Sequence, residues 1–162
     1  MMTSMTSMAQ TKEKQMQQKA RRLINMMTLD EKISQMMNET PGIPRLGIKP
    51  YDWWNEGLHG VGRDGRATVF PQPIGMGATF NPALIRQIGD AIATEGRAKY
   101  NVAQRNNNYA RYTGLTFWSP NINIFRDPRW GRGMETYGED PFLTGTLGTF
   151  SCVLPPVAWV LV

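Results

Sequence analysis

The segment from residue 81 to residue 100 constrains the fold most, because it has clear helical signals and lies between short apolar runs. Asn81 is a good N-cap and Pro82 a good first-turn residue. Ile85, Ile88 and Ile92 then recur at helical spacing. The apolar runs predict buried strands at residues 51–54, 68–70, 76–80 and 115–118. Strands separated by such a helix indicate a βα unit and a parallel sheet, so the predicted class is α/β.

Three further helices are predicted outside this unit. Residues 13–27 place apolar side chains on one helical face, and residues 1–28 are interpreted as an N-terminal helical segment. Thr28 and Glu31 have the spacing of a capping box and begin a second helix. A short helix is expected from Pro141. Residues 29–151 then form the main domain.

Residues 152–162 read CVLPPVAWVLV and carry no charge, unlike the sequence before them. Apolar surface left in water costs about 25 cal/mol per Å², so a solvated end of this composition is unfavourable. One hypothesis is that the tail is aberrant, with a reading frame that departs from the true one near residue 151. The alternative is a native strand that pairs within the domain.

Composition argues against several classes of partner. The net charge is +5, but the basic residues cluster at 12–22 among glutamines, which is typical of a solvated helix face and not of a nucleic-acid site. One Cys and one His predict no disulfide, no metal site and no cofactor. Neither a signal peptide nor a membrane-spanning run is visible, and the compartment is left open.

Two segments, 51–65 and 121–141, concentrate aromatic and charged residues together. Each comes after a predicted strand, which in a parallel sheet places it at the carboxyl edge, where active sites collect. Aromatic faces can stack on a sugar ring, while carboxylates and guanidinium groups hydrogen-bond its hydroxyls. A carbohydrate pocket is therefore one interpretation of these segments.

Structural roles are the alternative for the same residues. Two or three of the four tryptophans in these regions could be core residues, namely Trp53, Trp54, Trp118 and Trp130. Ion pairs that pin a loop could join Arg126 to Asp127 or Arg132 to Glu135. His59 could be a structural histidine. Asp52 and Glu56 are spaced as in a helical turn as well as in an acid/base pair.

The ordered series YDWWNEGLHGVGRDG, ATVFPQPIGMGATFNPALIRQIGDAIATEGRA and FWSPNINIFRDPRWGRGMETYGEDP resembles glycoside hydrolase family 3, in its β-xylosidase and β-glucosidase branch. The resemblance runs from about Leu29 to Phe150 and implies the N-terminal half of a (β/α)8 TIM-type barrel. A full barrel needs about 250 residues.

The resemblance also implies an exo-acting, retaining hydrolase of O-glycosyl bonds, acting on a β-linked oligosaccharide or glycoside. Its nucleophile Asp and acid/base Glu are expected beyond the end of this chain. Glu56 and Arg132 match substrate-binding positions, while Arg126 and His59 lie in the same motifs and could contact substrate or support the loops. No role is assigned to Arg63.

Two consequences follow from an interrupted barrel. The chain alone is expected to be inactive, and self-association is expected through an exposed sheet edge. The alternative function is a non-catalytic carbohydrate-binding or interaction fragment. The choice among xylose, glucose and arabinose is not determined by these residues.

Overall fold

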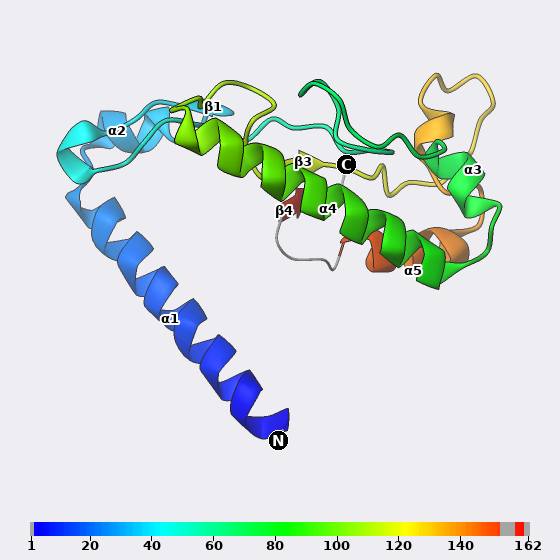
Figure 1. The fold of residues 1–162 in the computed structure, drawn as a ribbon, viewed down its shortest axis with the longest axis horizontal. Coiled ribbons are helices and arrows are strands. Elements are labelled where there is room, and N and C mark those ends of the chain that lie inside the picture. The colour runs from blue at the N-terminus through cyan, green and yellow to red at the C-terminus, as the bar shows by residue number, and fades with distance from the viewer. Residues whose placement is uncertain (1, 153–157, 161–162) are drawn as a thin grey trace. The chain divides into compact units, whose positions relative to one another are not determined.

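The computed structural model describes residues 2–152 and 158–160, and the chain divides into two compact units, Met1–Pro50 and Tyr51–Val162 (Figure 1). The first unit contains α1 (Met2–Met26), α2 (Leu29–Ser34), β1 (Glu39–Thr40) and the short 3-10 helix η1 (Pro44–Leu46). The predicted helix at 13–27 is therefore confirmed to Met26, and it begins at Met2, within the segment 1–28 expected to be helical.

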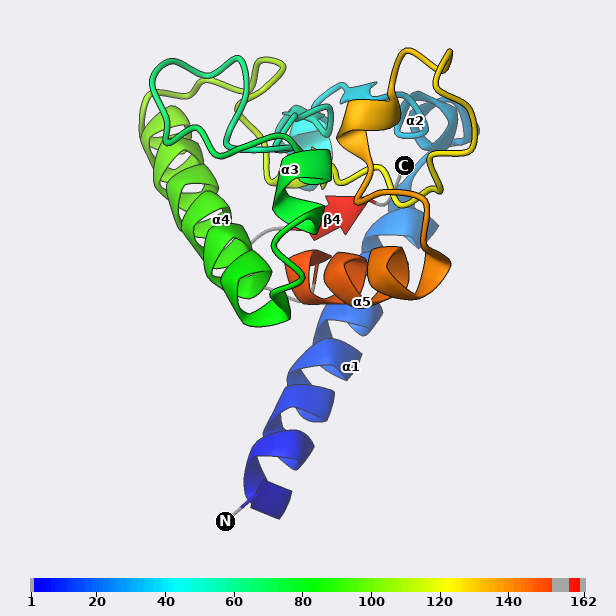
Figure 2. The same ribbon diagram turned by 90° about the vertical axis from the view of Figure 1, so that its right-hand side faces the viewer.

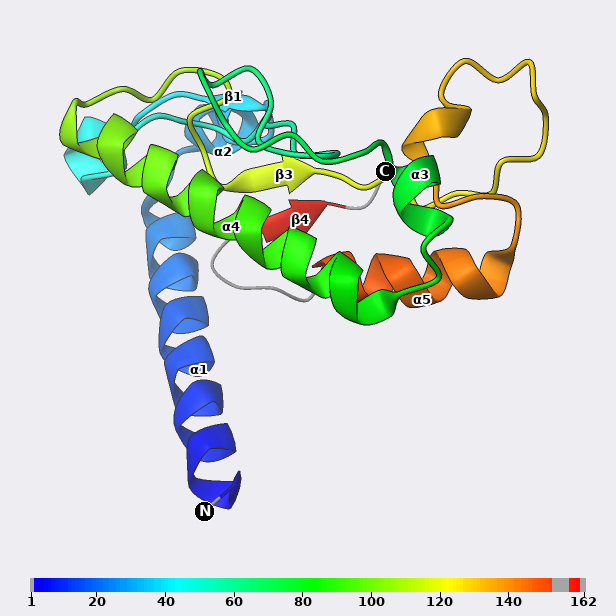
Figure 3. The same cartoon turned by 45° about the vertical axis from the view of Figure 1, so that its right-hand side comes forward.

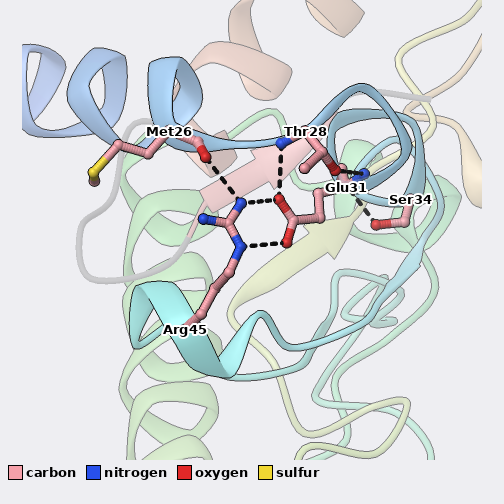
Figure 4. A network of polar contacts seen from close by, with 5 residues as sticks. All are labelled: Met26, Thr28, Glu31, Ser34 and Arg45. Atoms are coloured by element: carbon pink, nitrogen blue, oxygen red, sulfur yellow. Dashed lines mark hydrogen bonds and ion pairs between the residues drawn. The ribbon is translucent and has the colours of Figure 1, made fainter.

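A polar network joins α2 to η1 within the first unit (Figure 4). Thr28 forms the predicted capping box, since its Oγ1 accepts from Glu31 N (3.2 Å) and its N donates to Glu31 Oε2 (2.8 Å). Arg45 Nε donates to Glu31 Oε1 (2.8 Å), Arg45 Nη2 pairs with Oε2, and the same Nη2 donates to the Met26 carbonyl (2.9 Å). The Glu31 carboxylate thus accepts hydrogen bonds both from the backbone at the start of α2 and from Arg45.

The network makes the start of α2 sensitive to acid. The hydrogen bond from Arg45, followed by that from Thr28 N, lowers the pKa of Glu31 from 4.5 to about 2. A lowered folded-state pKa adds stability that is present above pH ~4.5 and is lost as the pH falls towards 2. We therefore expect the Glu31 carboxyl to titrate near pH 2 by NMR, with protection of the Glu31 amide lost in the same range.

Arg45→Met provides the matched comparison for this titration. Removing the guanidinium should move the Glu31 midpoint upward towards its ordinary value, while the capping box keeps part of the shift. A midpoint near 4.5 in the unaltered chain would contradict the network.

The second unit contains the predicted central helix and the sheet. Its elements are β2 (Tyr51–Asp52), α3 (Pro73–Gly77), α4 (Pro82–Arg105), β3 (Thr116–Trp118), the 3-10 helix η2 (Gly133–Glu135), α5 (Pro141–Cys152) and β4 (Ala158–Val160). Asn81 caps α4 by accepting from Leu84 N (3.1 Å), as its position predicts. The short helix expected from Pro141 is confirmed by α5.

Parallel pairing organises this unit (Figure 3). β3 pairs in parallel with β4, with Phe117 opposite Trp159. On the chain after β2, Asn55 forms a parallel bridge with Phe117, and Trp118 N donates to the Asn55 carbonyl (3.0 Å). The predicted strand at 115–118 is confirmed, and that at 51–54 is confirmed only for Tyr51–Asp52. The arrangement is mixed α/β with parallel strands.

The core lies where α3, α4 and α5 meet beside these strands (Figure 2). The face of α4 formed by the isoleucines at 85, 88 and 92 is buried, as their spacing predicts. The core contains Val61, Met76, Ile85, Ile88, Ile92, Phe117, Tyr137 and Leu147. Phe117 is 2% exposed, so the middle of β3 is anchored in this core.

Two predicted strands are wrong. Residues 68–70 have no strand partner among the described residues, and Val69 is 75% exposed. Residues 76–80 begin inside α3, because Pro73 fixes the first turn of a helix that buries Met76 and Gly77. Phe80 lies beyond it at a φ of 49° and is 73% exposed. Short apolar runs do not distinguish strands from helices or loops, which explains both errors.

The tail is only partly described. Cys152 ends α5, and Ala158–Val160 forms β4 in parallel with β3. Residues 153–157 and 161–162 lie outside the described residues. The interpretation of residues 152–162 as aberrant stays a prediction, as does its alternative of a native strand.

Gly77 is a close packing point between α3 and the segment after η2. A Cβ built at Gly77 would lie 2.4 Å from the Tyr137 carbonyl oxygen. Gly77→Ala should therefore lower the free energy of unfolding by about 1–3 kcal/mol. Gly145→Ala on α5, where nothing lies within 4 Å of the new Cβ, should raise it by about 0.5–1 kcal/mol. Denaturant unfolding of both variants tests the contact, which equal stabilities would contradict.

Candidate functional site

A cleft of about 480 Å³ opens at the carboxyl ends of the parallel segments. Glu56 directly follows Asn55, and Ser119 directly follows β3. Ser119 Oγ accepts from Gly57 N (3.3 Å), so the two chain segments are tied immediately beyond their pairing. The cleft is lined by Trp54, Glu56, Leu58, Arg63, Trp118, Ser119, Asn121, Arg132 and Glu135.

Tryptophan rings form an apolar wall. The Trp118 ring stacks on the Trp53 ring, with a centroid distance of 4.9 Å and an interplanar angle of 7°. It also stacks on the Trp54 ring, with a centroid distance of 5.1 Å and an interplanar angle of 15°. Trp54 and Trp118 line the cleft, and Trp54 is 37% exposed. Trp130 instead packs edge-on against Phe125. Trp54 and Trp118 therefore have both roles that the sequence suggested, because they pack against each other and also line the cleft.

Glu56 forms one charged arm of the cleft. Its Oε2 accepts from Arg63 Nε (2.8 Å), and this hydrogen bond to the Glu56 carboxylate raises the pKa of Arg63 above its ordinary value. The Arg63 guanidinium also lies over the Tyr112 ring, 5.7 Å from its centroid. Among the described residues, Glu56 Oε1 has no hydrogen-bond partner. The carboxylate is therefore held on one oxygen only.

Arg132 forms a second charged arm. Its Nε and Nη2 donate to Glu135 Oε2 at 2.8 and 2.5 Å across η2, which raises the pKa of Arg132. The ion pair proposed as a structural alternative is therefore present, but both partners line the cleft and the Arg132 side chain is 53% exposed. Gly133 seats this turn, because a Cβ there would lie 2.3 Å from the Phe125 ring.

His59 and Arg126 are not among the residues that line the cleft. His59 Nδ1 lies 2.8 Å from the Phe70 carbonyl oxygen, and its Nε2 lies 3.3 Å from Gln72 Nε2. These contacts give His59 a supporting position within its loop. Arg126 Nη1 donates to Asn123 Oδ1 (2.8 Å).

Asp127 and Asp52 have other partners than those suggested from the sequence. The suggested pair of Arg126 with Asp127 is wrong, because Asp127 pairs with Arg129, which lowers the pKa of Asp127. Asp52 does not lie with Glu56 in the cleft. It is 3% exposed, accepts from Trp54 N (2.9 Å) and pairs with Arg111 (3.3 Å), so it fixes the backbone near β2.

Sequence reasoning missed Arg63 and Glu135 as cleft residues, together with Ser119 and Asn121. Ser119 and Asn121 could have been found from their place just after a predicted strand. The ion pair of Arg63 with Glu56 could not, because it depends on a loop that turns back on itself. Within residues 2–152 and 158–160, no group of three or more His, Cys, Asp and Glu side chains could hold a metal ion.

The arrangement combines hydrogen-bond acceptors, forked donors and an aromatic wall. Such a site suits a ring that has an apolar face and several hydroxyl groups. Separately, none of the described helices is long and apolar enough to cross a membrane.

Comparison with known proteins places this chain among carbohydrate-active sequences. Residues 18–152 match the family described as "Glycosyl hydrolase family 3 N terminal domain". The chain is 52% identical over 128 residues to a xylan 1,4-β-xylosidase of Xylanibacter ruminicola, covering 78% of this chain and 15% of that protein. It is 51% identical over 138 residues to a probable β-D-xylosidase of Arabidopsis thaliana, covering 79% of this chain and 17% of that protein.

Solved structures give the same grouping. A GH3 exo-β-xylosidase in complex with a xylobiose aziridine activity-based probe matches with a TM-score of 0.69 and 42% identity, over 80% of this chain and 17% of that one. A GH3 β-glucosidase of Bifidobacterium adolescentis matches with a TM-score of 0.68 and 29% identity, and the match covers 85% of this chain and 20% of that one. The chain thus spans about a sixth of the curated relatives that it matches.

Proposed function

The chain belongs to glycoside hydrolase family 3, as its N-terminal domain, and on that premise we propose that its cleft binds one sugar ring of a β-linked glycoside. Glu56 would accept hydrogen bonds from sugar hydroxyls, and Arg132 would donate to an adjacent pair of oxygens. Trp54 and Trp118 would contact the apolar face of the ring. Arg126 and His59 are proposed to support the two loops.

One observation supports this proposal above the others. Glu56 and Arg132 come from segments far apart in the sequence, yet both line the same cleft at the carboxyl edge of the parallel segments. Both stay accessible, with side-chain exposures of 39% and 53%. Exposed ion pairs contribute only about 0–1 kcal/mol, so a ligand can exchange with their partners at little cost.

A xyloside is the sugar class that we propose first. The two curated relatives compared above are named as xylosidases, and the solved xylosidase is in complex with a xylobiose-based probe. β-Glucosides are the second candidate, since solved β-glucosidases of the family also match.

We further propose that the chain is an incomplete catalytic unit from the first half of a (β/α)8-type barrel. Retaining hydrolysis requires two carboxyl groups about 5–5.5 Å apart, one as nucleophile and one as acid/base. The carboxylates in this cleft, Glu56 and Glu135, each accept from a guanidinium group, an arrangement suited to binding. The nucleophile Asp and the acid/base Glu would come from further sequence. An uncovered sheet edge would also favour self-association.

Weak sugar binding by the full chain is the direct test of the cleft. Titration with xylose and xylobiose, followed by NMR of the indole Nε1–H signals, should shift the signals of Trp54 and Trp118. Glu56→Gln and Arg132→Met should each weaken binding about tenfold or more, because each removes a charge-assisted hydrogen bond.

Arg129→Met is the matched control for Arg132→Met. Arg129 lies in the same loop and is also ion-paired, but its side chain is 89% exposed and it does not line the cleft. It should leave binding unchanged. If sugar shifts no cleft signal, or if all three variants bind alike, the proposed site is wrong.

Purified chain should show no hydrolysis of aryl β-xyloside or aryl β-glucoside above the buffer rate. The reason is that losing the nucleophile removes most of the rate enhancement of such enzymes. Chromophore release is the measurement. Turnover that co-elutes with the chain and disappears in Glu56→Gln would refute the incomplete catalytic unit.

A further inference from the structure

Lys99 of α4 holds the loop that carries Arg63. Its Nζ donates to the carbonyl oxygens of Asp64 (2.5 Å), which directly follows Arg63, and of Arg66 (2.8 Å), three residues after Arg63. A single ammonium group therefore binds two carbonyls of one tight turn. Lys99 does not line the cleft, so its connection to the site runs through the loop.

Glu95, one helical turn before Lys99, holds the end of the same loop. It accepts from Thr68 N (3.0 Å) at Oε2 and from Thr68 Oγ1 (2.5 Å) at Oε1. Residues four apart lie on the same face of a helix, so both side chains act from one face of α4. At the base of the loop, Phe70 N donates to the His59 carbonyl (2.8 Å).

The backbone of Arg63 shows why such restraint is needed. Its φ of 60° lies in the left-handed region, which is unfavourable for a residue with a side chain. Such conformations persist only where the surrounding structure imposes them. From this backbone, Arg63 Nε reaches Glu56 Oε2 at 2.8 Å, while Gly62 N donates to the Glu56 carbonyl (2.8 Å).

We propose that Lys99 and Glu95 are positioning residues of the cleft, acting through Arg63 on the carboxylate of Glu56. With the loop fixed, Arg63 occupies Oε2 of Glu56 and leaves Oε1 as the acceptor for a ligand hydroxyl. The positioning is a property of the unliganded chain, and it rests on the proposed function only for the identity of the ligand.

Lys99→Met tests the positioning through two readouts. The first is the Nε–H signal of Arg63 in NMR, whose exchange with water should become at least about threefold faster, while that of Arg132 stays unchanged. The second is xylose affinity, which should fall about threefold. In an Arg63→Met background, Lys99→Met should cause no further loss, because its effect passes through Arg63.

Three variants keep the test specific. Lys99→Arg can donate to both carbonyls and should restore the Arg63 signal. Arg86→Met removes an exposed cation from the same helix and should change neither readout. Thr68→Val removes only the hydroxyl that Glu95 Oε1 accepts from, so it should move the Arg63 signal in the same direction by a smaller amount.

An unchanged Arg63 signal in a folded Lys99→Met chain would overturn the proposal. If that variant does not fold, Thr68→Val decides: a shift of the Arg63 signal supports positioning, and no shift overturns it. Absence of xylose binding by the unaltered chain would count against the proposed function alone, since the Arg63 signal tests the positioning without any ligand.

Discussion

The hydrogen bond from Trp118 N to the Asn55 carbonyl (3.0 Å) is the contact on which the cleft depends. It sets the parallel register between the chain after β2 and β3, so both segments end at the same edge. The residues that directly follow them, Glu56 and Ser119, therefore lie at that edge. The burial of Phe117 against α4 keeps this register in place, because a slip by one residue would turn Phe117 out of the core.

The charged residues of the cleft are balanced before any ligand arrives. Glu56 pairs with Arg63 and Arg132 pairs with Glu135, so two carboxylates and two guanidinium groups line one opening. Neutral hydroxyl groups can insert into such pairs by replacing one hydrogen bond with another. Because each carboxylate already has a guanidinium partner, the charges of the cleft are largely neutralised, which suits an uncharged, hydroxyl-rich ligand better than a charged one.

The sequence predicted those parts of the fold that depend on local signals. Asn81 with its following isoleucines, and Thr28 with Glu31, both form the helix starts that their spacing indicates. The strand at 115–118 was found because it is short, apolar and bounded by a turn. The predicted strands at 68–70 and 76–80 are wrong. Thr68 is held as part of a loop by Glu95 of α4, and Met76 belongs to a short helix that begins at Pro73 and packs against Tyr137.

The site shows the same division. The motifs led to Glu56 and Arg132, which line the cleft, and the carboxyl-edge argument explains why. Arg63 was left without a role because its side chain reaches Glu56 only through a left-handed backbone and a loop held by α4. Contacts of this kind depend on residues distant in the chain, so no local spacing reveals them.

Gly133 carries no functional group, yet it sits directly beneath the second charged arm. The absence of a side chain lets the turn between Arg132 and Glu135 rest on the Phe125 ring. Any larger residue would lift that turn and carry the cation and the anion away from the opening together. The shape of the cleft beside Arg132 and Glu135 thus depends on the missing side chain of Gly133 as much as on the charged groups themselves.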